Sequence, residues 1–511
     1  IIKFYKKKIS LYLNYLKNQS FKFFHMSPQK LISLLLGPLL FLIFTFFNNS
    51  QIIPSEASYM IGIVLWMALW WATESVPIAA TSLLPIILLP ITNILEISEA
   101  TESYGHKYIF LYLGGFIIAI AIEKWNLHKR IALNIISLIG TNISKIVLGF
   151  MVATAFLSMF ISNTATTVMM LPIALSVINQ FEFSEKRKKK FGKALMLSIA
   201  YSASIGGIAT LIGTPTNLVL AGFLSETYNI EITFSQWIIF GFPISIFLLL
   251  ICWYYLIHYK FKFKKSDNSL GKEEIKRQLF ELGKINQEEK LVLIVFIMTG
   301  FLWITRPFFI QFFIPNVDDT IIAIFGALIL FILRSTKKNR PLLKWKEAVK
   351  IPWGILLLFG GGMALAKGIE ISNLGLWIAD QAKLLKGLNL IVLLIIIITV
   401  VNFFTEITSN VATIAMLLPI LAPIAIGLKI HPYIFLVGAS IASSCAFMLP
   451  VATPPNAVVF SSGLLKIIDM IKVGFFLNIF SILIISIITY FLLPILWDFE
   501  VNFIPDIFLI K

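Results

Sequence analysis

The chain has 511 residues, of which 58% are hydrophobic and 13% are charged, and its mean hydropathy is +0.89. Soluble globular proteins of this length do not reach such values, so the composition indicates an integral membrane protein. The formal net charge of +16 does not indicate nucleic-acid binding, because the basic residues cluster in short loops between apolar runs, as the positive-inside rule expects. The two cysteines, Cys252 and Cys445, lie inside apolar runs and offer neither a disulfide framework nor a zinc site.

About eleven apolar runs have the length that a helix needs to cross roughly 30 Å of hydrocarbon. We expect transmembrane helices near residues 31–49, 58–73, 77–92, 108–124, 192–224, 236–258, 291–314, 318–334, 352–369, 432–464 and 472–497. Two further apolar stretches, residues 142–180 and 386–427, carry polar residues at their centres. Because a polar turn at membrane depth is tolerated only against protein or a water-filled cavity, these stretches predict two re-entrant helical hairpins. The expected fold class is an all-α polytopic membrane protein.

The distribution of charge predicts the orientation and the division of the chain. An N-terminus in the cytoplasm places the basic loops on one side and the acidic tail of the chain outside, as the positive-inside rule requires. We expect a cytoplasmic N-terminus, an external C-terminus and a retained first span. The predicted segments are a basic N-terminal segment (1–30), a first half (31–258), a charged cytoplasmic linker (259–290) and a second half (291–511).

The two halves repeat the same order of parts. Residues 110–116 (FLYLGGF) resemble residues 356–362 (LLLFGGG), and each run is followed by one predicted hairpin and one Thr-Pro segment. An odd number of predicted crossings between equivalent parts places the halves in opposite orientations. Inverted repeats of this kind are typical of secondary transporters.

The hairpin centres carry the first candidate site residues. Ser162, Asn163 and Thr164 precede an apolar helix, and Ser409, Asn410 and Val411 occupy the equivalent place in the second half. A helix start presents free N–H groups and a positive dipole end to a carboxylate, while the end of the preceding arm presents carbonyl oxygens to a small cation. Such residues often only join membrane helices by hydrogen bonds, but their duplication favours a transport site.

A Thr-Pro pair interrupts one apolar segment in each half, at Thr214-Pro215 and at Thr453-Pro454. Proline removes a backbone donor and clashes with the preceding turn, so each helix is expected to break there. An ordinary proline kink is the alternative. Interrupted helices at matching positions in two halves indicate a binding site near the middle of the membrane.

Glu74 lies at the expected cytoplasmic end of a span, where the sequence favours a structural contact and a role in transport equally. Glu123, Glu370 and Glu406 lie near helix ends or hairpin arms, where a buried acid could relay protons, and we interpret them as structural. The five histidines have no partner at metal-ligand spacing and receive no role. A membrane-embedded enzyme would need a motif such as His-Glu-x-x-His or a nucleophile elbow, and neither occurs in the sequence. We therefore do not expect an enzyme.

Six motifs in one order resemble the divalent anion/sodium symporters, a family that carries dicarboxylates, citrate or sulfate. The motifs are residues 71–78 (WATESVPI), 162–164 (SNT), 213–217 (GTPTN), 352–362 (PWGILLLFGGG), 409–413 (SNVAT) and 453–456 (TPPN), and the resemblance extends from about residue 35 to 493. It implies a homodimer in which a transport domain moves like an elevator against a scaffold domain. It also implies a bacterial inner-membrane location and no cofactor beyond sodium as the coupling ion.

The resemblance further implies two sodium sites and one anion site. One sodium site would use Ser158, Ser162, Asn163 and Gly213, and the other would use Thr405, Thr408, Asn410 and Ala452. The anion, a small dicarboxylate such as succinate, malate or fumarate, would lie among Ser162, Asn163, Thr164, Thr214, Pro215, Ser409, Asn410, Val411, Thr453 and Pro454.

Two residues depart from the pattern of the family. Val411 stands where many members have threonine, and Thr216 replaces the second proline of a Thr-Pro-Pro-Asn, so we expect a slightly different shape at the first break. Two alternatives remain at this point: a sodium-independent dicarboxylate, citrate or tartrate exchanger, and a sodium/proton antiporter of related architecture.

Overall fold

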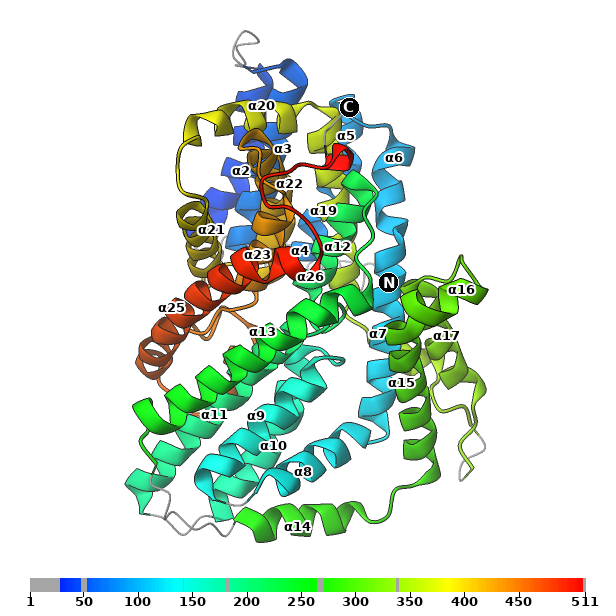
Figure 1. Ribbon diagram of the computed structural model, residues 1–511, viewed down its shortest axis with the longest axis vertical. Helices are drawn as coiled ribbons and strands as arrows, with labels where there is room; N and C mark the ends of the chain where they lie inside the picture. The colour runs from blue at the N-terminus through cyan, green and yellow to red at the C-terminus, as the bar shows by residue number, and fades with distance from the viewer. Residues whose placement is uncertain are drawn as a thin grey trace, which may run out of the picture.

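The computed structural model describes residues 28–46, 53–140, 142–180, 184–263, 271–336 and 340–508. These residues form helices and connecting segments, and their only β pairing is one isolated bridge between Arg334 and Pro341. The expectation of an all-helical protein is therefore confirmed for the part of the chain that the structure describes (Figure 1). Most of the predicted N-terminal segment 1–30 lies outside the described residues.

The helices of the first half of the chain are α2 (Pro28–Phe46), α3 (Ser55–Thr73), α4 (Ile78–Thr81), α5 (Leu84–Ile91), α6 (Ile97–Glu102), α7 (Lys107–Lys124), α8 (Leu127–Ile139), α9 (Ile143–Ser158), α10 (Asn163–Gln180), α11 (Glu185–Ile208), α12 (Pro215–Tyr228) and α13 (Phe234–Tyr254). The second half contains α14 (Gly271–Leu282), α15 (Gln287–Thr305), α16 (Gln311–Phe313), α17 (Asp319–Ile332), α18 (Trp345–Ala348), α19 (Trp353–Ile371), α20 (Leu374–Ala382), α21 (Leu390–Phe404), α22 (Asn410–Gly427), α23 (Tyr433–Ser443), α24 (Pro454–Phe460), α25 (Ile467–Phe491) and α26 (Leu493–Leu496).

Seven helices of the described chain are long and apolar enough to cross a membrane. Several of them keep much of their apolar surface exposed; on α15, for example, Ile294, Ile297 and Phe301 are each about 60% exposed. Such side chains suit contact with lipid. The predicted span at 77–92 is wrong as a single helix, because the structure divides it into α4 and α5. Pro85 lies in the first turn of α5, where a missing N–H is tolerated, and so marks the start of a new helix.

The order of elements from α7 to α12 recurs from α19 to α24, and the repeat includes two helices that the sequence did not predict. Helix α8 follows α7 after Asn126, and α20 follows α19 after Asn373. Both asparagines adopt the left-handed conformation, with φ of 56° and 57°. Asparagine enters this conformation more readily than most residues, so the same turn redirects the chain twice. In Figure 1, α8 and α20 lie near opposite ends of the molecule.

Two helix–turn–helix pairs and two interrupted helices occur where the sequence predicts hairpins and breaks. The pairs are α9–α10 and α21–α22, whose second helices begin at Asn163 and Asn410. The interrupted helices are α11–α12 and α23–α24, which resume at Pro215 and Pro454. Each pair packs against the interrupted helix of its own half, α9 and α10 against α11, and α21 and α22 against α23.

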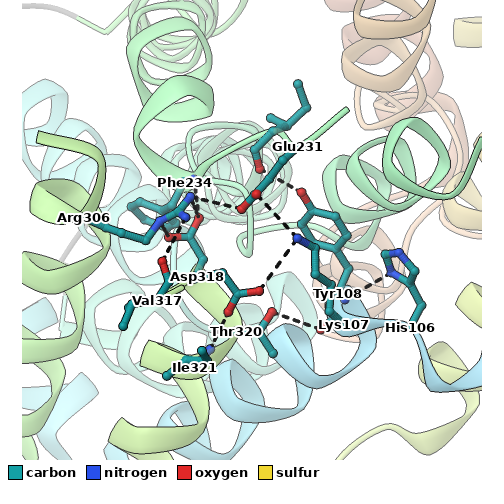
Figure 2. Close-up of polar contacts among 12 residues, drawn as sticks. His106, Lys107, Tyr108, Glu231, Phe234, Arg306, Val317, Asp318, Thr320 and Ile321 are labelled. Atoms are coloured by element: carbon teal, nitrogen blue, oxygen red, sulfur yellow. Dashed lines mark hydrogen bonds and ion pairs between the residues drawn. The ribbon is translucent and has the colours of Figure 1, made fainter. Parts of the chain in front are cut away.

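A network of ion pairs joins the two halves away from these turns (Figure 2). The Arg306 guanidinium, 1% exposed, lies 2.7 Å from Asp319 and 3.3 Å from Glu231 in the loop between α12 and α13. Lys107 at the start of α7 lies 3.5 Å from Glu231 and 3.8 Å from Asp318. Because each charged group has an oppositely charged neighbour, the network can hold α7, α13, α15 and α17 together.

The predicted linker contains a helix, α14, which packs against α8 and α10. Its residue Glu274 accepts hydrogen bonds from Ser176 on α10 and from Arg277 on α14 itself. Chiefly through the hydrogen bond from Arg277, these contacts lower the pKa of the Glu274 carboxyl to about 2. The linker is therefore attached to the first helix–turn–helix pair.

Candidate functional site

A cavity of about 950 Å³ lies where the four interruptions of the helices meet. It is lined by all ten predicted anion-binding residues, Ser162, Asn163, Thr164, Thr214, Pro215, Ser409, Asn410, Val411, Thr453 and Pro454. Thr408 and Ala452 from the predicted sodium sites line it as well. The other three predicted sodium ligands, Ser158, Gly213 and Thr405, are buried. Predicted site residues from both halves of the chain thus line one cavity.

Four oxygen atoms come together behind the first turn. The Ser158 hydroxyl lies 2.6 Å from Asn163 Oδ1 and 2.7 Å from the carbonyl oxygen of Ala203. Asn163 Oδ1 also lies 3.3 Å from the carbonyl oxygens of Ala203 and Gly213. A hydroxyl carries one proton and can donate to only one of these oxygens. With the Asn163 amide turned by 180°, its nitrogen donates to the other three oxygens and satisfies them. With Oδ1 facing them, the cluster has the ligand set that a small hard cation takes, so a bound cation would select this orientation.

The second turn repeats this arrangement. The Thr405 hydroxyl lies 2.7 Å from Asn410 Oδ1 and 3.1 Å from the carbonyl oxygen of Ser443. The Thr408 hydroxyl lies 2.9 Å from the carbonyl oxygen of Phe404. The single proton of the Thr405 hydroxyl again faces two acceptors, so in each half one hydroxyl contacts both an asparagine oxygen and a carbonyl oxygen of the interrupted helix. The sequence did not predict the carbonyl groups of Ala203 and Ser443 as members of the clusters, because every residue type has a backbone carbonyl oxygen.

Glycine allows the interrupted helix of the first half to approach the turn this closely. A Cβ atom at Gly207 would lie 2.7 Å from Asn163 Oδ1, and a Cβ atom at Gly213 would lie 2.5 Å from the carbonyl oxygen of Gly207. Both distances are too short for any side chain. Substitution at either glycine would therefore separate the oxygen atoms of the first cluster.

The wall of the cavity carries little formal charge but several helix starts. Helices α10, α12 and α22 begin there, at Asn163, Pro215 and Asn410, and direct backbone N–H groups and positive dipole ends toward it. The charged residues among those lining it are Lys30 and Glu74, and the Lys30 ammonium donates to the backbone oxygen of Glu74 at 3.3 Å. An anion in this cavity would meet backbone dipoles rather than a cluster of basic side chains.

A family model described as "Sodium:sulfate symporter transmembrane region" matches residues 28–497. The chain belongs to this family. The sodium-dependent dicarboxylate transporter SdcS of Staphylococcus saprophyticus is 45% identical over 475 residues, which cover 91% of this chain and 92% of that protein. SdcS of Staphylococcus aureus strain bovine RF122 is 46% identical over 486 residues, with 93% and 94% covered. The resemblance seen in the sequence motifs is thus confirmed.

A solved structure also matches the fold. It is titled "Structure and Function of Neisseria gonorrhoeae MtrF Illuminates a Class of Antimetabolite Efflux Pumps", and the match covers 88% of this chain and 98% of that one with a TM-score of 0.54. The two sequences are 15% identical. At this level the likeness shows a shared fold and carries no statement about the transported molecule.

The two halves of this family member differ in how the turn is attached to the interrupted helix. In the first half, the Thr210 hydroxyl donates to the carbonyl oxygen of Met159. In the second half, Glu406 occupies the position equivalent to Met159, and its carboxylate accepts hydrogen bonds from the N–H groups of Phe447, Met448 and Leu449 at 2.7, 2.9 and 3.0 Å.

A fourth hydrogen bond reaches the Glu406 carboxylate from Asn478 Nδ2 on α25, at 2.8 Å, and the Glu406 residue is 3% exposed. This carboxylate therefore fixes three consecutive N–H groups of the unwound segment after α23 beside the second turn. The contacts fit the structural role expected for Glu406. They also differ from the single Thr210–Met159 hydrogen bond of the first half, although the motifs of the two halves are alike.

A buried asparagine braces each break. Asn217 Nδ2 donates to the carbonyl oxygen of Thr210 at 2.8 Å, and Asn456 Nδ2 donates to those of Leu449 at 2.9 Å and Ala446 at 3.1 Å. These carbonyl groups lie in the unwound segments after α11 and α23, and those of Thr210 and Leu449 also accept from the N–H groups of Gly213 and Ala452. The asparagine of each Thr-Pro-x-Asn motif thus joins the first turn of one helix to the unwound segment before it.

The two departures from the family pattern have clear positions. Val411 lines the cavity without a hydroxyl group at the place where the first half has Thr164. The backbone is alike at Thr214 and Thr453, which precede α12 and α24, with φ and ψ of −135° and 143° against −140° and 147°, but only the Thr453 hydroxyl accepts a capping hydrogen bond, from Asn456 N. The Thr216 hydroxyl instead lies 2.8 Å from the Ser444 hydroxyl and joins the two interrupted helices.

Proposed function

We propose that the chain is a secondary transporter that carries small dicarboxylates across the membrane together with sodium ions. The observation that carries this proposal is the pair of equivalent oxygen clusters, at Ser158–Asn163 and at Thr405–Asn410, beside one cavity lined by helix starts. The two curated relatives are named sodium-dependent dicarboxylate transporters, which supports the same substrate class.

The proposed anion lies between the two turns. A four-carbon dicarboxylate such as succinate, malate or fumarate has a carboxylate at each end, and one carboxylate would meet the start of α10 while the other meets the start of α22. The Ser162, Thr164, Thr214 and Thr453 side chains line the same cavity and can add hydroxyl donors. Val411 offers no donor, so the two carboxylates are held by different numbers of side-chain hydroxyl groups.

Sodium would supply net positive charge, because the charges of Lys30 and Glu74 cancel among the described residues that line the cavity. A doubly charged anion is costly inside a membrane unless it is compensated. Cations in the two oxygen clusters would lie directly behind the turns that hold the carboxylates, so each species would stabilise the other. Linkage then requires that sodium raises the affinity for succinate by the same factor by which succinate raises the affinity for sodium.

The remaining features of the proposal concern assembly and movement. We propose a homodimer in the bacterial inner membrane, with two re-entrant hairpins, inverted halves and an elevator movement of the part that contains the cavity. With the proposed cytoplasmic N-terminus, Lys30 and Glu74 lie at the cytoplasmic ends of α2 and α3. Because both residues line the cavity, this arrangement corresponds to a cavity open toward the cytoplasm.

Two alanine variants test the assignment in proteoliposomes. Asn163→Ala and Asn410→Ala remove the asparagine oxygen from one cluster each, and we expect each to abolish sodium-dependent succinate uptake while expression is retained. Asn134→Ala is the matched control, because this asparagine is exposed on α8 and, within the described part of the chain, bonds only to the carbonyl oxygen of Arg130. Undiminished uptake in both cluster variants would contradict the proposal. Succinate counterflow at full rate without sodium would identify an exchanger instead.

A further inference from the structure

One wall of the cavity is formed by residues outside the Ser-Asn turns and the Thr-Pro breaks. Helices α4, α7 and α19 contribute Ile78, Ala79, Tyr112, Gly354, Ile355 and Leu358 to it. Five of these six residues have no polar side-chain atom. The Tyr112 hydroxyl is therefore the one side-chain hydrogen-bonding group on this wall.

Tyr112 is 2% exposed, and its ring is held between aromatic neighbours. The ring centroid lies 4.0 Å from that of Phe116 and 5.7 Å from that of Phe359. Within the residues that the structure describes, the Tyr112 hydroxyl makes no hydrogen bond, yet it is not among the polar atoms sealed from solvent without a partner. A buried tyrosine usually finds a partner for its hydroxyl. Here the remaining direction is into the cavity.

The preceding tyrosines show that the chain satisfies such hydroxyl groups elsewhere. Tyr108 lies one turn before Tyr112 on α7, and Tyr104 lies in the short 3-10 turn that precedes α7. The Tyr104 hydroxyl donates to the carbonyl oxygen of Ser82, and the Tyr108 hydroxyl donates to that of Ile232 at 3.1 Å. Tyr112 departs from this pattern at the position where α7 reaches the cavity.

The position of Tyr112 along α7 places it near the first break. Gly115, three residues later and on the same side of the helix, lies against the unwound segment before Thr214: a Cβ atom there would be 3.7 Å from the side chain of Ile212. Thr214 and Pro215 line the same cavity as Tyr112. The hydroxyl group thus belongs to the part of the cavity where the first-half motifs would hold a carboxylate.

We propose that Tyr112 is a further substrate-binding residue, whose hydroxyl donates a hydrogen bond to the carboxylate held by the first-half motifs. This inference rests on the proposed function, since it requires a dicarboxylate in the cavity. The donor comes from α7, which carries neither a Ser-Asn turn nor a Thr-Pro break, so it lets a further wall of the cavity contribute to the affinity for the anion.

The test is Tyr112→Phe in proteoliposomes, with the initial rate of sodium-dependent uptake measured over a range of succinate concentrations. Loss of one hydrogen bond to a charged group predicts a KM for succinate raised roughly tenfold. Because the substitution leaves both oxygen clusters intact, the sodium concentration for half-maximal uptake, measured at saturating succinate for each protein, should stay within about twofold of the wild-type value. A KM equal to that of the wild type would overturn the inference.

Two variants control for the loss of a tyrosine hydroxyl as such. Tyr108→Phe removes a hydroxyl that is bonded to the backbone one turn away, and Tyr201→Phe removes one that is sealed inside the protein without a partner. Both should leave the KM for succinate within about twofold of the wild-type value. An equal rise in these variants would contradict a specific role for Tyr112. A wild-type protein that carries no succinate overturns the proposed function as well, whereas wild-type transport with an unchanged KM in Tyr112→Phe overturns only this inference.

A labelling experiment covers the case in which Tyr112→Phe does not fold. Tyr112→Cys in detergent places a thiol at the cavity, while the native Cys252 and Cys445 are both 0% exposed. Saturating succinate with sodium should slow the reaction of this thiol with a maleimide at least severalfold. An unchanged reaction rate in protein that binds succinate would overturn the inference.

Discussion

Replacement of Glu406 tests how the second turn is held against its interrupted helix. The carboxylate makes four hydrogen bonds, and its two oxygens share them unequally. Oε1 accepts from Phe447 N, Met448 N and Asn478 Nδ2, and Oε2 accepts from Leu449 N. Glutamine and alanine at this position therefore remove different numbers of acceptors.

The expected loss of stability follows from this count. In Glu406→Gln the amide oxygen can take the place of Oε1 and keep three donors satisfied, while the amide nitrogen faces the N–H group of Leu449. One buried donor without an acceptor costs about 1–3 kcal/mol. In Glu406→Ala all four donors lose their acceptor, and the same 1–3 kcal/mol for each amounts to about 4–12 kcal/mol.

Thermal denaturation of the purified protein in detergent measures the order of the variants. We expect the wild type to be the most stable, Glu406→Gln to be intermediate and Glu406→Ala to lose at least twice as much as Glu406→Gln. Glu370→Gln serves as the matched control, because this half-buried acid has no side-chain hydrogen bond within the described residues. Equal stability of the wild type and Glu406→Ala would refute the reasoning, as would a larger loss in Glu406→Gln than in Glu406→Ala.

Three further substitutions have defined outcomes. Arg306→Gln leaves the Asp319 carboxylate buried without its cation and should cost about 3–5 kcal/mol in thermal denaturation, and adding Asp319→Asn should recover part of the loss; no recovery would contradict the ion pair. Glu274→Gln should lower stability at pH 7, and the gap should close as the pH falls from about 4.5 toward about 2. This sign follows because a lowered pKa stabilises the fold above the unfolded-state pKa, and a gap independent of pH would contradict it. Asn456→Ala removes the two hydrogen bonds that Asn456 Nδ2 donates to the unwound segment at the second break. It should reduce the rise in Tm that sodium produces, and an undiminished rise would argue against a role of these bonds in sodium binding.

The interruptions of the helices could be predicted from the sequence, because particular residue types cause them. Proline at 215 and 454 has no N–H group to continue the helix, and the structure starts a new helix at each of these residues. The polar residues at 162–164 and 409–411 likewise mark turns in otherwise apolar stretches. The pattern identified these places in both halves, and the structure brings them to one cavity.

The contacts that hold the site together could not be predicted in this way. The Glu406 carboxylate bonds to N–H groups about forty residues later, and backbone donors are the same for every residue type. The second oxygen cluster includes the carbonyl oxygen of Ser443, which is equally invisible in a sequence. Helix α8 was missed because its basic residues were interpreted as a cytoplasmic loop, and α14 because its charge was interpreted as a linker.

Reconstitution of the purified protein in proteoliposomes tests sodium-coupled dicarboxylate transport most directly. An inward sodium gradient, with potassium as the matched control, is applied at fixed membrane potential while the uptake of labelled succinate is followed. The proposed mechanism predicts accumulation of succinate above its external concentration with sodium and none with potassium. Equal uptake with the two cations, or succinate exchange at full rate without sodium, would contradict it.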